Sequence, residues 1–154
     1  MSDEATTDPG DPQRTIWTVG HGDRDFDSVA AHLEAHGVQT IVDVRSQPYS
    51  KYTPDFTKGE LEVVAATAGF GYRWLGDRLG GRPEPGPSQL ESGLEEVEGL
   101  AATSHVALLC AEVDPVYCHR TKYLAPALIA RGFSIVHILG SGDATPHQGS
   151  LLTD

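Results

Sequence analysis

Hydrophobic residues in this chain fall into short continuous runs, separated by longer stretches in which they recur every three or four positions. Short apolar runs are typical of buried strands, and the longer spacing is typical of helices that bury one face. The runs predict strands over residues 15–19, 40–44, 71–75, 106–110 and 133–138. Because stretches of helical spacing lie between the runs, the pattern predicts strands and helices in alternation.

Polar residues mark where the predicted helices begin. A side-chain oxygen at the N-cap accepts a hydrogen bond from a free N–H group of the first turn. Asp25 is the predicted cap of the first helix, and capping boxes that begin at Thr57 and Ser88 predict the next two helix starts. In the last helix, Pro126 removes one backbone hydrogen bond and should kink the helix.

Segments rich in Gly, Pro and charged residues set the limits of the domain. Residues 1–13 should form a disordered acidic leader, and residues 140–154 should form a loose C-terminal tail. Residues 14–139 then form a single domain, interrupted by long loops over residues 48–56 and 76–88. Loops of this length in a compact domain are commonly lids or binding loops.

The alternation predicts an α/β fold with an open, mainly parallel five-stranded sheet and helices on both faces, a Rossmann-like architecture. In such folds ligands bind beyond the carboxyl ends of the strands. Polar or reactive residues gather at those predicted ends: His21, Asp43, Arg45, Cys110, Glu112 and His137. We therefore expect the functional site at this rim of the sheet.

The segment from Val106 to Leu124 combines the fourth predicted strand with a helix start. Asp114-Pro115 favours helix initiation, because Asp caps and Pro fits the first helical position. Free N–H groups at a helix start favour anions. The side chains in this segment that can carry chemistry are Glu112, Cys118, His119 and Arg120.

The net charge of −11 argues against extended binding to a nucleic-acid backbone, but it permits a local basic pocket for a small anionic or nucleotide-type ligand. Asp and Glu total 22, while lysine occurs only at Lys51, Lys58 and Lys122. This composition is typical of proteins that work in high salt, and it indicates a halophilic source. No apolar run is long enough to span a membrane, so we expect a cytoplasmic protein.

The sequence contains two cysteines, Cys110 and Cys118, whose spacing matches neither a zinc motif nor a CxxC redox motif. We expect free thiols, with Cys110 in the core. Cys118 lies in the first turn of a predicted helix near Arg120, and both features lower the pKa of a thiol. Cys118 could be a nucleophile or a redox-active thiol, or it could pack as a small buried residue.

Arg45 and Arg120 are the predicted anion-binding residues, because a guanidinium captures phosphate or carboxylate through two hydrogen bonds. The alternative is a salt bridge to Asp43 or Glu112 that only holds the loops together. These two carboxylates follow strands that are neighbours in the commonest strand order. If they lie close together, their pKa values split and they divide acid and base roles.

The histidines and aromatic residues leave several roles open. His21 and His119 are candidate proton carriers; with His137 they could form a metal set or serve as hydrogen-bonding struts. The spacing identifies no ligand set, so the sequence predicts no cofactor and no metal. The aromatic residues near the long loops could stack on a ligand or fold the loops onto the core. They are Tyr49, Tyr52, Phe56, Tyr72 and Trp74.

The strand-end residues belong to motifs that run in order from about residue 15 to residue 139. The motifs are Thr18-Val19-Gly20-His21, Asp43-Val44-Arg45 with Pro48 and Ser50, Phe56, Tyr72-x-x-Leu75-Gly76-x-x-Leu79-Gly80-Gly81, Cys110-Ala111-Glu112-x-Asp114-Pro115-x-x-Cys118-His119-Arg120 and His137-Ile138. This set resembles the domain of unknown function 488 family. The resemblance implies a fold and a site location, while the activity is unassigned. We place Ser50 and Tyr72 with the two arginines as ligand-binding residues.

The first functional hypothesis is a small enzyme that acts on a phosphorylated or nucleotide-type substrate by hydrolysis or group transfer. The two arginines would hold the anion, and a carboxylate with a histidine would move the proton. The chain has no G-x-G-x-x-G after the first strand and no P-loop, which argues against a dinucleotide cofactor and a P-loop NTPase. The alternatives are a thiol-dependent sulfur-transfer or redox enzyme using Cys118, a non-catalytic nucleotide- or anion-binding module, and a polar cluster that only ties loops together.

Overall fold

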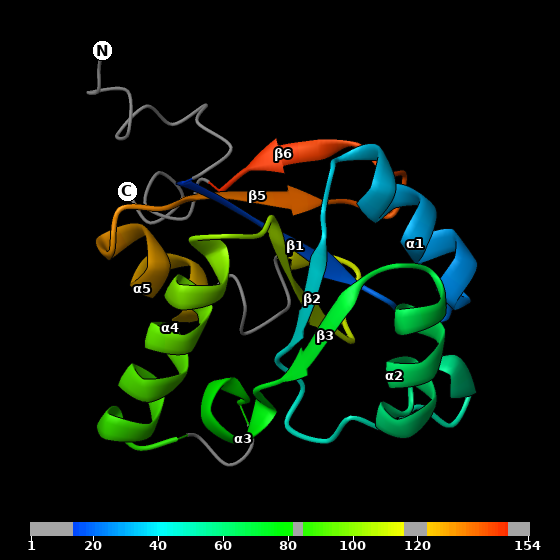
Figure 1. The fold of residues 1–154 in the computed structure, drawn as a ribbon, viewed down its shortest axis with the longest axis horizontal. Coiled ribbons are helices and arrows are strands. Elements are labelled where there is room, and N and C mark those ends of the chain that lie inside the picture. The colour runs from blue at the N-terminus through cyan, green and yellow to red at the C-terminus, as the bar shows by residue number, and fades with distance from the viewer. Residues whose placement is uncertain (1–13, 82–84, 116–122, 148–154) are drawn as a thin grey trace.

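The computed structural model describes residues 14–81, 85–115 and 123–147. Within them the chain forms one six-stranded sheet with the order β3-β2-β4-β1-β5-β6 (Figure 1). The strands are β1 Thr15–Gly20, β2 Thr40–Asp43, β3 Gly71–Trp74, β4 Val106–Cys110, β5 Ser134–Ile138 and β6 Ala144–Pro146. Strands β1 to β5 are all parallel to one another, and β6 is antiparallel to β5.

Helices cover both faces of the sheet, so the predicted α/β architecture is confirmed. The helices are α1 Phe26–Ala35, the 3₁₀ helix η3 Pro54–Phe56, α2 Lys58–Thr67, α3 Gly76–Leu79, α4 Pro87–Ala101 and α5 Ala125–Ala130. Leu33 of α1 and Leu61 of α2 pack into one core, while Val97 of α4 and Leu128 of α5 pack into a second core. Figure 1 shows the two pairs of helices on opposite sides of the strands.

Strand burial follows from position in the sheet. All five residues of β4, in the middle of the sheet, are buried, whereas the edge strand β3 alternates between exposed and half-buried residues. A strand covered on both faces needs a continuous apolar run, which is why the sequence pattern located β4 to the residue.

The sheet has six strands, not the predicted five, because part of the segment expected to be a loose tail forms β6. His137 of β5 pairs with Thr145 of β6. Three residues that end in Pro146 carry too little alternation to be recognised as a strand. Pro146 is tolerated there because β6 lies at the sheet edge, where one side needs no ladder hydrogen bonds.

Short helices also occur in the two segments predicted to be irregular. η3 lies at the end of the 48–56 loop, and α3 begins the 76–88 loop. Each is only about one turn long, and such turns are stabilised by packing rather than by a recurring sequence pattern. In both helices the last residue, Phe56 or Leu79, is buried in a core.

The predicted helix starts are only partly confirmed. Asp25 caps α1, since its Oδ1 accepts a hydrogen bond from Ser28 N at 2.9 Å. Thr57 precedes α2 but makes no cap hydrogen bond, because its hydroxyl accepts from Ser50 N at 3.2 Å. Helix α4 begins at Pro87 rather than after Ser88, and Pro126 lies in the first turn of α5, where proline does not kink a helix.

Candidate functional site

The carboxyl ends of β1 and β2 bring three predicted site residues together. Asp43 ends β2, Arg45 follows two residues later, and His21 follows β1 directly. Side chains alternate along a strand, so Asp43 and Arg45 share the face of Ile41, which packs with α1 and α2. All three polar side chains are buried, with 0 to 5% of their surface exposed.

Asp43 and Arg45 form a bidentate ion pair. Arg45 Nε donates to Asp43 Oδ1 at 2.8 Å, and Arg45 Nη2 donates to Asp43 Oδ2 at 2.7 Å. The Arg45 backbone N–H donates to the same Oδ1 at 3.1 Å. The salt bridge that the sequence offered as an alternative is therefore present, and it fixes the plane of the guanidinium.

Tyr72 completes the hydrogen bonding of Asp43. Tyr72 lies opposite Ile41 in the β2–β3 register, and its hydroxyl donates to Asp43 Oδ2 at 2.6 Å. Burial and the Asp43 charge raise the pKa of Tyr72 well above its usual value, so the hydroxyl keeps its proton. Asp43 now accepts four hydrogen bonds, which is the capacity of a carboxylate. This geometry suits Asp43 to holding Arg45 in place rather than to moving a proton.

His21 contacts the other side of Arg45. His21 Nδ1 lies 2.8 Å from the Gly22 carbonyl oxygen, and Nε2 lies 3.2 Å from Arg45 Nη1. A carbonyl only accepts and a guanidinium only donates, so the proton sits on Nδ1 and Nε2 accepts from Arg45. Burial, aided by the charge of Arg45, lowers the pKa of His21 to about 4. His21 is therefore neutral near pH 7, with its lone pair directed at Arg45.

The loop after β2 leads to Phe56, which contacts one face of the His21 ring. Phe56 stacks on the His21 ring with centroids 4.5 Å apart and planes 14° from parallel. Ser50 Oγ lies 2.5 Å from Thr53 Oγ1 and accepts from Thr53 N at 3.1 Å, at the turn that leads into η3 and Phe56. Ser50 thus holds the loop that places Phe56, while its predicted contact with a ligand stays a prediction.

Two glycines allow the loops at this rim to approach each other closely. A Cβ on Gly20 would lie 1.8 Å from the Glu112 carbonyl oxygen, and a Cβ on Gly76 would lie 1.8 Å from the Arg45 carbonyl oxygen. That Arg45 oxygen also accepts from Trp74 Nε1 at 2.8 Å. Any larger residue at these positions would push apart the strand ends that carry the cluster.

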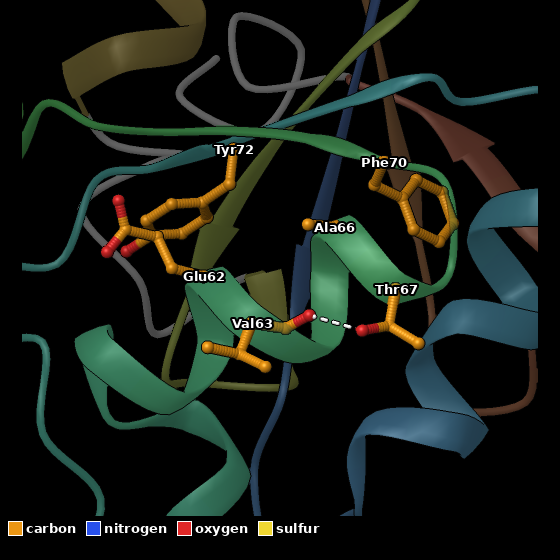
Figure 2. Close-up of a pocket in the computed structure, with 6 residues that line it drawn as sticks. All are labelled: Glu62, Val63, Ala66, Thr67, Phe70 and Tyr72. Carbon is orange, nitrogen blue, oxygen red and sulfur yellow. Dashed lines mark hydrogen bonds between the residues drawn. The ribbon is translucent and has the colours of Figure 1, made fainter.

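A hollow of about 520 Å³ opens between α2 and the edge strand β3 (Figure 2). Its lining residues are Glu62, Val63, Ala66, Thr67, Phe70 and Tyr72. The ring of Tyr72 lines this hollow while its hydroxyl donates to Asp43, so Tyr72 joins the hollow to the buried cluster.

The other predicted site residues lie in or after β4, in β5, or outside the described part of the chain. Glu112 is exposed in the loop after β4, whose strand is the neighbour of β2 as predicted. Cys110 is buried in β4 as expected, but it is disulfide-bonded, so the free-thiol prediction is wrong for this residue. His137 lies on the other face of the sheet, where its ring bonds Thr18 and His147. Cys118, His119 and Arg120 lie outside the described residues.

Arg24 belongs to the same rim, although the sequence pattern did not single it out. Its guanidinium is turned back onto the end of β1, where Nη2 donates to the Gly20 carbonyl oxygen. An arginine in a polar loop is common, and only the turn at Gly22, with φ of 55°, brings this one back to the strand end. The glycine at position 22, shortly after a predicted strand, is the sequence signal that could have pointed to it, because glycine readily adopts a positive φ.

Two further features bear on cofactors and membranes. Within the described ranges, no three or more His, Cys, Asp or Glu side chains gather in a way that suits a metal ion. Among the helices of that same part of the chain, none has the length and hydrophobicity that a membrane crossing requires.

The fold and the cluster define an α/β protein with a buried arginine–carboxylate pair at the carboxyl ends of its parallel strands. Residues 25–88 match the model of the family described as "Domain of unknown function DUF488", which confirms the resemblance seen in the motifs. The matched segment contains Asp43, Arg45 and Tyr72, and His21 lies just before it. Neither the search of curated proteins nor the search of solved structures found a match.

Proposed function

We propose that this protein binds a phosphorylated or nucleotide-type small molecule at the carboxyl ends of β1 and β2 and acts on it by hydrolysis or group transfer. Arg45 is the anchor for the anionic group. The observation that carries the proposal is the state of its guanidinium. Three of its five N–H groups are used, two by Asp43 and one by His21, which leaves two that donate no hydrogen bond within the described part of the chain, although the guanidinium also interacts with the nearby Tyr72 hydroxyl.

Two unused N–H groups on a buried cation are costly. Each buried donor without a partner costs about 1–3 kcal/mol, and the cost is higher when the group is charged. A phosphate oxygen that accepts from both N–H groups removes this penalty and gains a bidentate, charge-assisted contact. Asp43 and His21 already fix the guanidinium plane. Ligand binding therefore costs little additional conformational entropy of the Arg45 side chain.

The same contacts suggest how Arg45 contributes to a reaction. A rigid guanidinium stabilises negative charge that develops on a transferring phosphoryl or acyl group. His21 and Asp43 act in this proposal as positioning residues for Arg45, because the His21 lone pair and all four acceptor sites of Asp43 are occupied. The proton is then carried by another group, for which the exposed Glu112 is a candidate.

A thermal-shift panel of inorganic phosphate, nucleotides and sugar phosphates, followed by product analysis of each hit, tests the proposal. We expect at least one phosphorylated compound to raise the melting temperature of the wild-type protein and to be converted. Arg45→Lys keeps the charge but loses the planar fork, so it should lose most of the shift. The matched control is Arg73→Lys, since Arg73 is an exposed arginine paired with Glu96.

The proposal fails if no phosphorylated compound shifts the melting temperature, or if Arg45→Lys and Arg73→Lys behave alike. A shift without any product, across the whole panel, would overturn the enzymatic part and leave a binding module.

A further inference from the structure

Arg24 lies three residues after His21 along the chain, in the loop between β1 and α1. Its backbone N–H donates to the His21 carbonyl oxygen at 3.0 Å, so it follows His21 in a tight turn. Its Nη1 donates to the Gly140 carbonyl oxygen at 3.4 Å, and its Nη2 to that of Gly20. The Arg24 guanidinium therefore connects the last residue of β1, Gly20, to the loop that follows β5, which contains Gly140.

The surroundings of Arg24 differ from those of other half-buried arginines. Arg78 and Arg131 each pair with carboxylates, namely Glu96 for the first and Glu91 and Glu98 for the second. The hydrogen-bond acceptors of Arg24 are carbonyl oxygens alone, and its buried Nε has no acceptor within the described residues. No carboxylate of the described residues lies within ion-pair distance of its guanidinium, although the charge of the neighbouring Asp23 acts on it.

Both arginines of the rim interact with His21. Arg45 donates to the His21 ring at 3.2 Å, while Arg24 contacts the His21 backbone. The charges of both arginines act with burial to lower the pKa of His21. Asp43 pairs with Arg45, whereas Arg24 has only the charge of Asp23 beside it in sequence and forms no ion pair within the described residues.

We infer that Arg24 is a second anion-binding residue of the Arg45 site and that it selects ligands carrying two adjacent anionic groups, such as a diphosphate. The inference rests on the proposed function, because it assigns a ligand class to the same site. One anionic group accepts from Arg45, and the neighbouring group is bound by Arg24. A residue that merely capped the Gly20 and Gly140 carbonyls would stabilise the loops and would not discriminate between ligands.

Calorimetric titration with inorganic phosphate and with pyrophosphate tests this inference. We expect the wild-type protein to bind pyrophosphate about tenfold or more tightly than phosphate, as one additional charge-assisted contact allows. Arg24→Gln should abolish this preference by weakening pyrophosphate binding about tenfold while changing phosphate binding less than about threefold. Arg24→Lys, which keeps the charge, should retain part of the preference and serves if the glutamine variant does not fold.

Arg14→Gln is the matched control. Arg14 also donates to backbone carbonyls, those of Arg131 and Gly132, but it precedes β1 and so lies at the opposite end of that strand. It should leave both affinities unchanged. Equal affinities of the wild-type protein for the two anions, or an Arg24→Gln variant that keeps the preference, would overturn the role of Arg24 alone. Binding of neither anion would instead overturn the proposed function.

Discussion

At the scale of single residues, the site is a continuous line of hydrogen bonds from Tyr72 through Asp43 and Arg45 to His21. Each member is buried or half-buried, where an unpaired polar group is costly and a paired one is held firmly. The line ends on a backbone carbonyl, that of Gly22, which fixes the His21 tautomer. Three side chains and one backbone group therefore set the position of a single guanidinium.

The lowered pKa of His21 predicts how stability depends on pH. The folded protein holds His21 neutral down to about pH 4, whereas the unfolded chain protonates it near 6.5. The unfolded state therefore binds more protons between these values, and the free energy of unfolding falls as the pH drops from 6.5 toward 4. The His21 contribution to this loss is roughly 3 kcal/mol, and it is complete below pH 4.

Urea denaturation between pH 7.5 and 4 measures this dependence. His21→Gln keeps one donor and one acceptor but does not titrate, so its unfolding free energy should fall less steeply than that of the wild type. His32→Gln, at a half-buried histidine of α1, is the control for loss of a histidine elsewhere in the fold. Parallel curves for the wild type and His21→Gln would contradict the assignment of a neutral His21.

How far the sequence predicts these residues depends on the distance between them along the chain. His21, Asp43 and Arg45 lie at or just after the ends of predicted strands, so the rule for parallel sheets places them at one rim from the sequence alone. The contact between Tyr72 and Asp43 depends on the β2–β3 register, which no local pattern encodes. The disulfide at Cys110 was not predicted, because a cysteine in a buried apolar run is typical of a free thiol in the core.

At the scale of elements, the rim depends on how closely loops pack over the strand ends. The first residue of α3, Gly76, faces the carbonyl of Arg45, and the last residue of β1, Gly20, faces the carbonyl of Glu112. The side chains of the cluster therefore lie on backbone segments that leave no room for a Cβ on the facing glycine. The short helix α3 and strand β6 could not be predicted from the sequence, because segments of three or four residues show no hydrophobic periodicity.

Alanine substitution at two glycines tests this packing. Gly76→Ala places a methyl group 1.8 Å from the Arg45 carbonyl oxygen and should destabilise the protein by about 1–3 kcal/mol. Gly99→Ala, inside α4 with no neighbouring atom within 4 Å, should stabilise it by roughly 0.5–1 kcal/mol through helix propensity.

Chemical denaturation of both variants gives the two free energies directly. Opposite signs are the expected result. A Gly76→Ala variant as stable as the wild type would show that the start of α3 does not pack tightly against the Arg45 backbone.

At the scale of the whole molecule, charge is distributed unevenly. The chain carries 22 acidic and 11 basic residues apart from histidine, and several arginines form ion pairs on the surface, such as Arg131 with Glu91 and Glu98. Arg24 and Arg45 are instead turned inward at the ends of the strands. In the function we propose, the acidic surface repels anions broadly and the two inward arginines attract them at one rim.

We propose from the same composition that the chain is adapted to high salt. Unpaired carboxylates repel one another, and added KCl screens that repulsion. The urea midpoint should therefore rise as KCl is increased from about 0.1 M to 1 M, since the Debye length falls from about 10 Å to 3 Å. A midpoint that falls with KCl would mean that the surface ion pairs outweigh the excess of carboxylates.

The central claim is that Arg45 presents a preorganised pair of N–H groups to an anionic ligand. Calorimetric titration of phosphate into the wild-type protein and Arg45→Lys tests it most directly, with Arg73→Lys as the control for loss of an arginine. The account predicts saturable binding that falls at least about tenfold in Arg45→Lys and is unchanged in Arg73→Lys. Equal binding by all three proteins would contradict it.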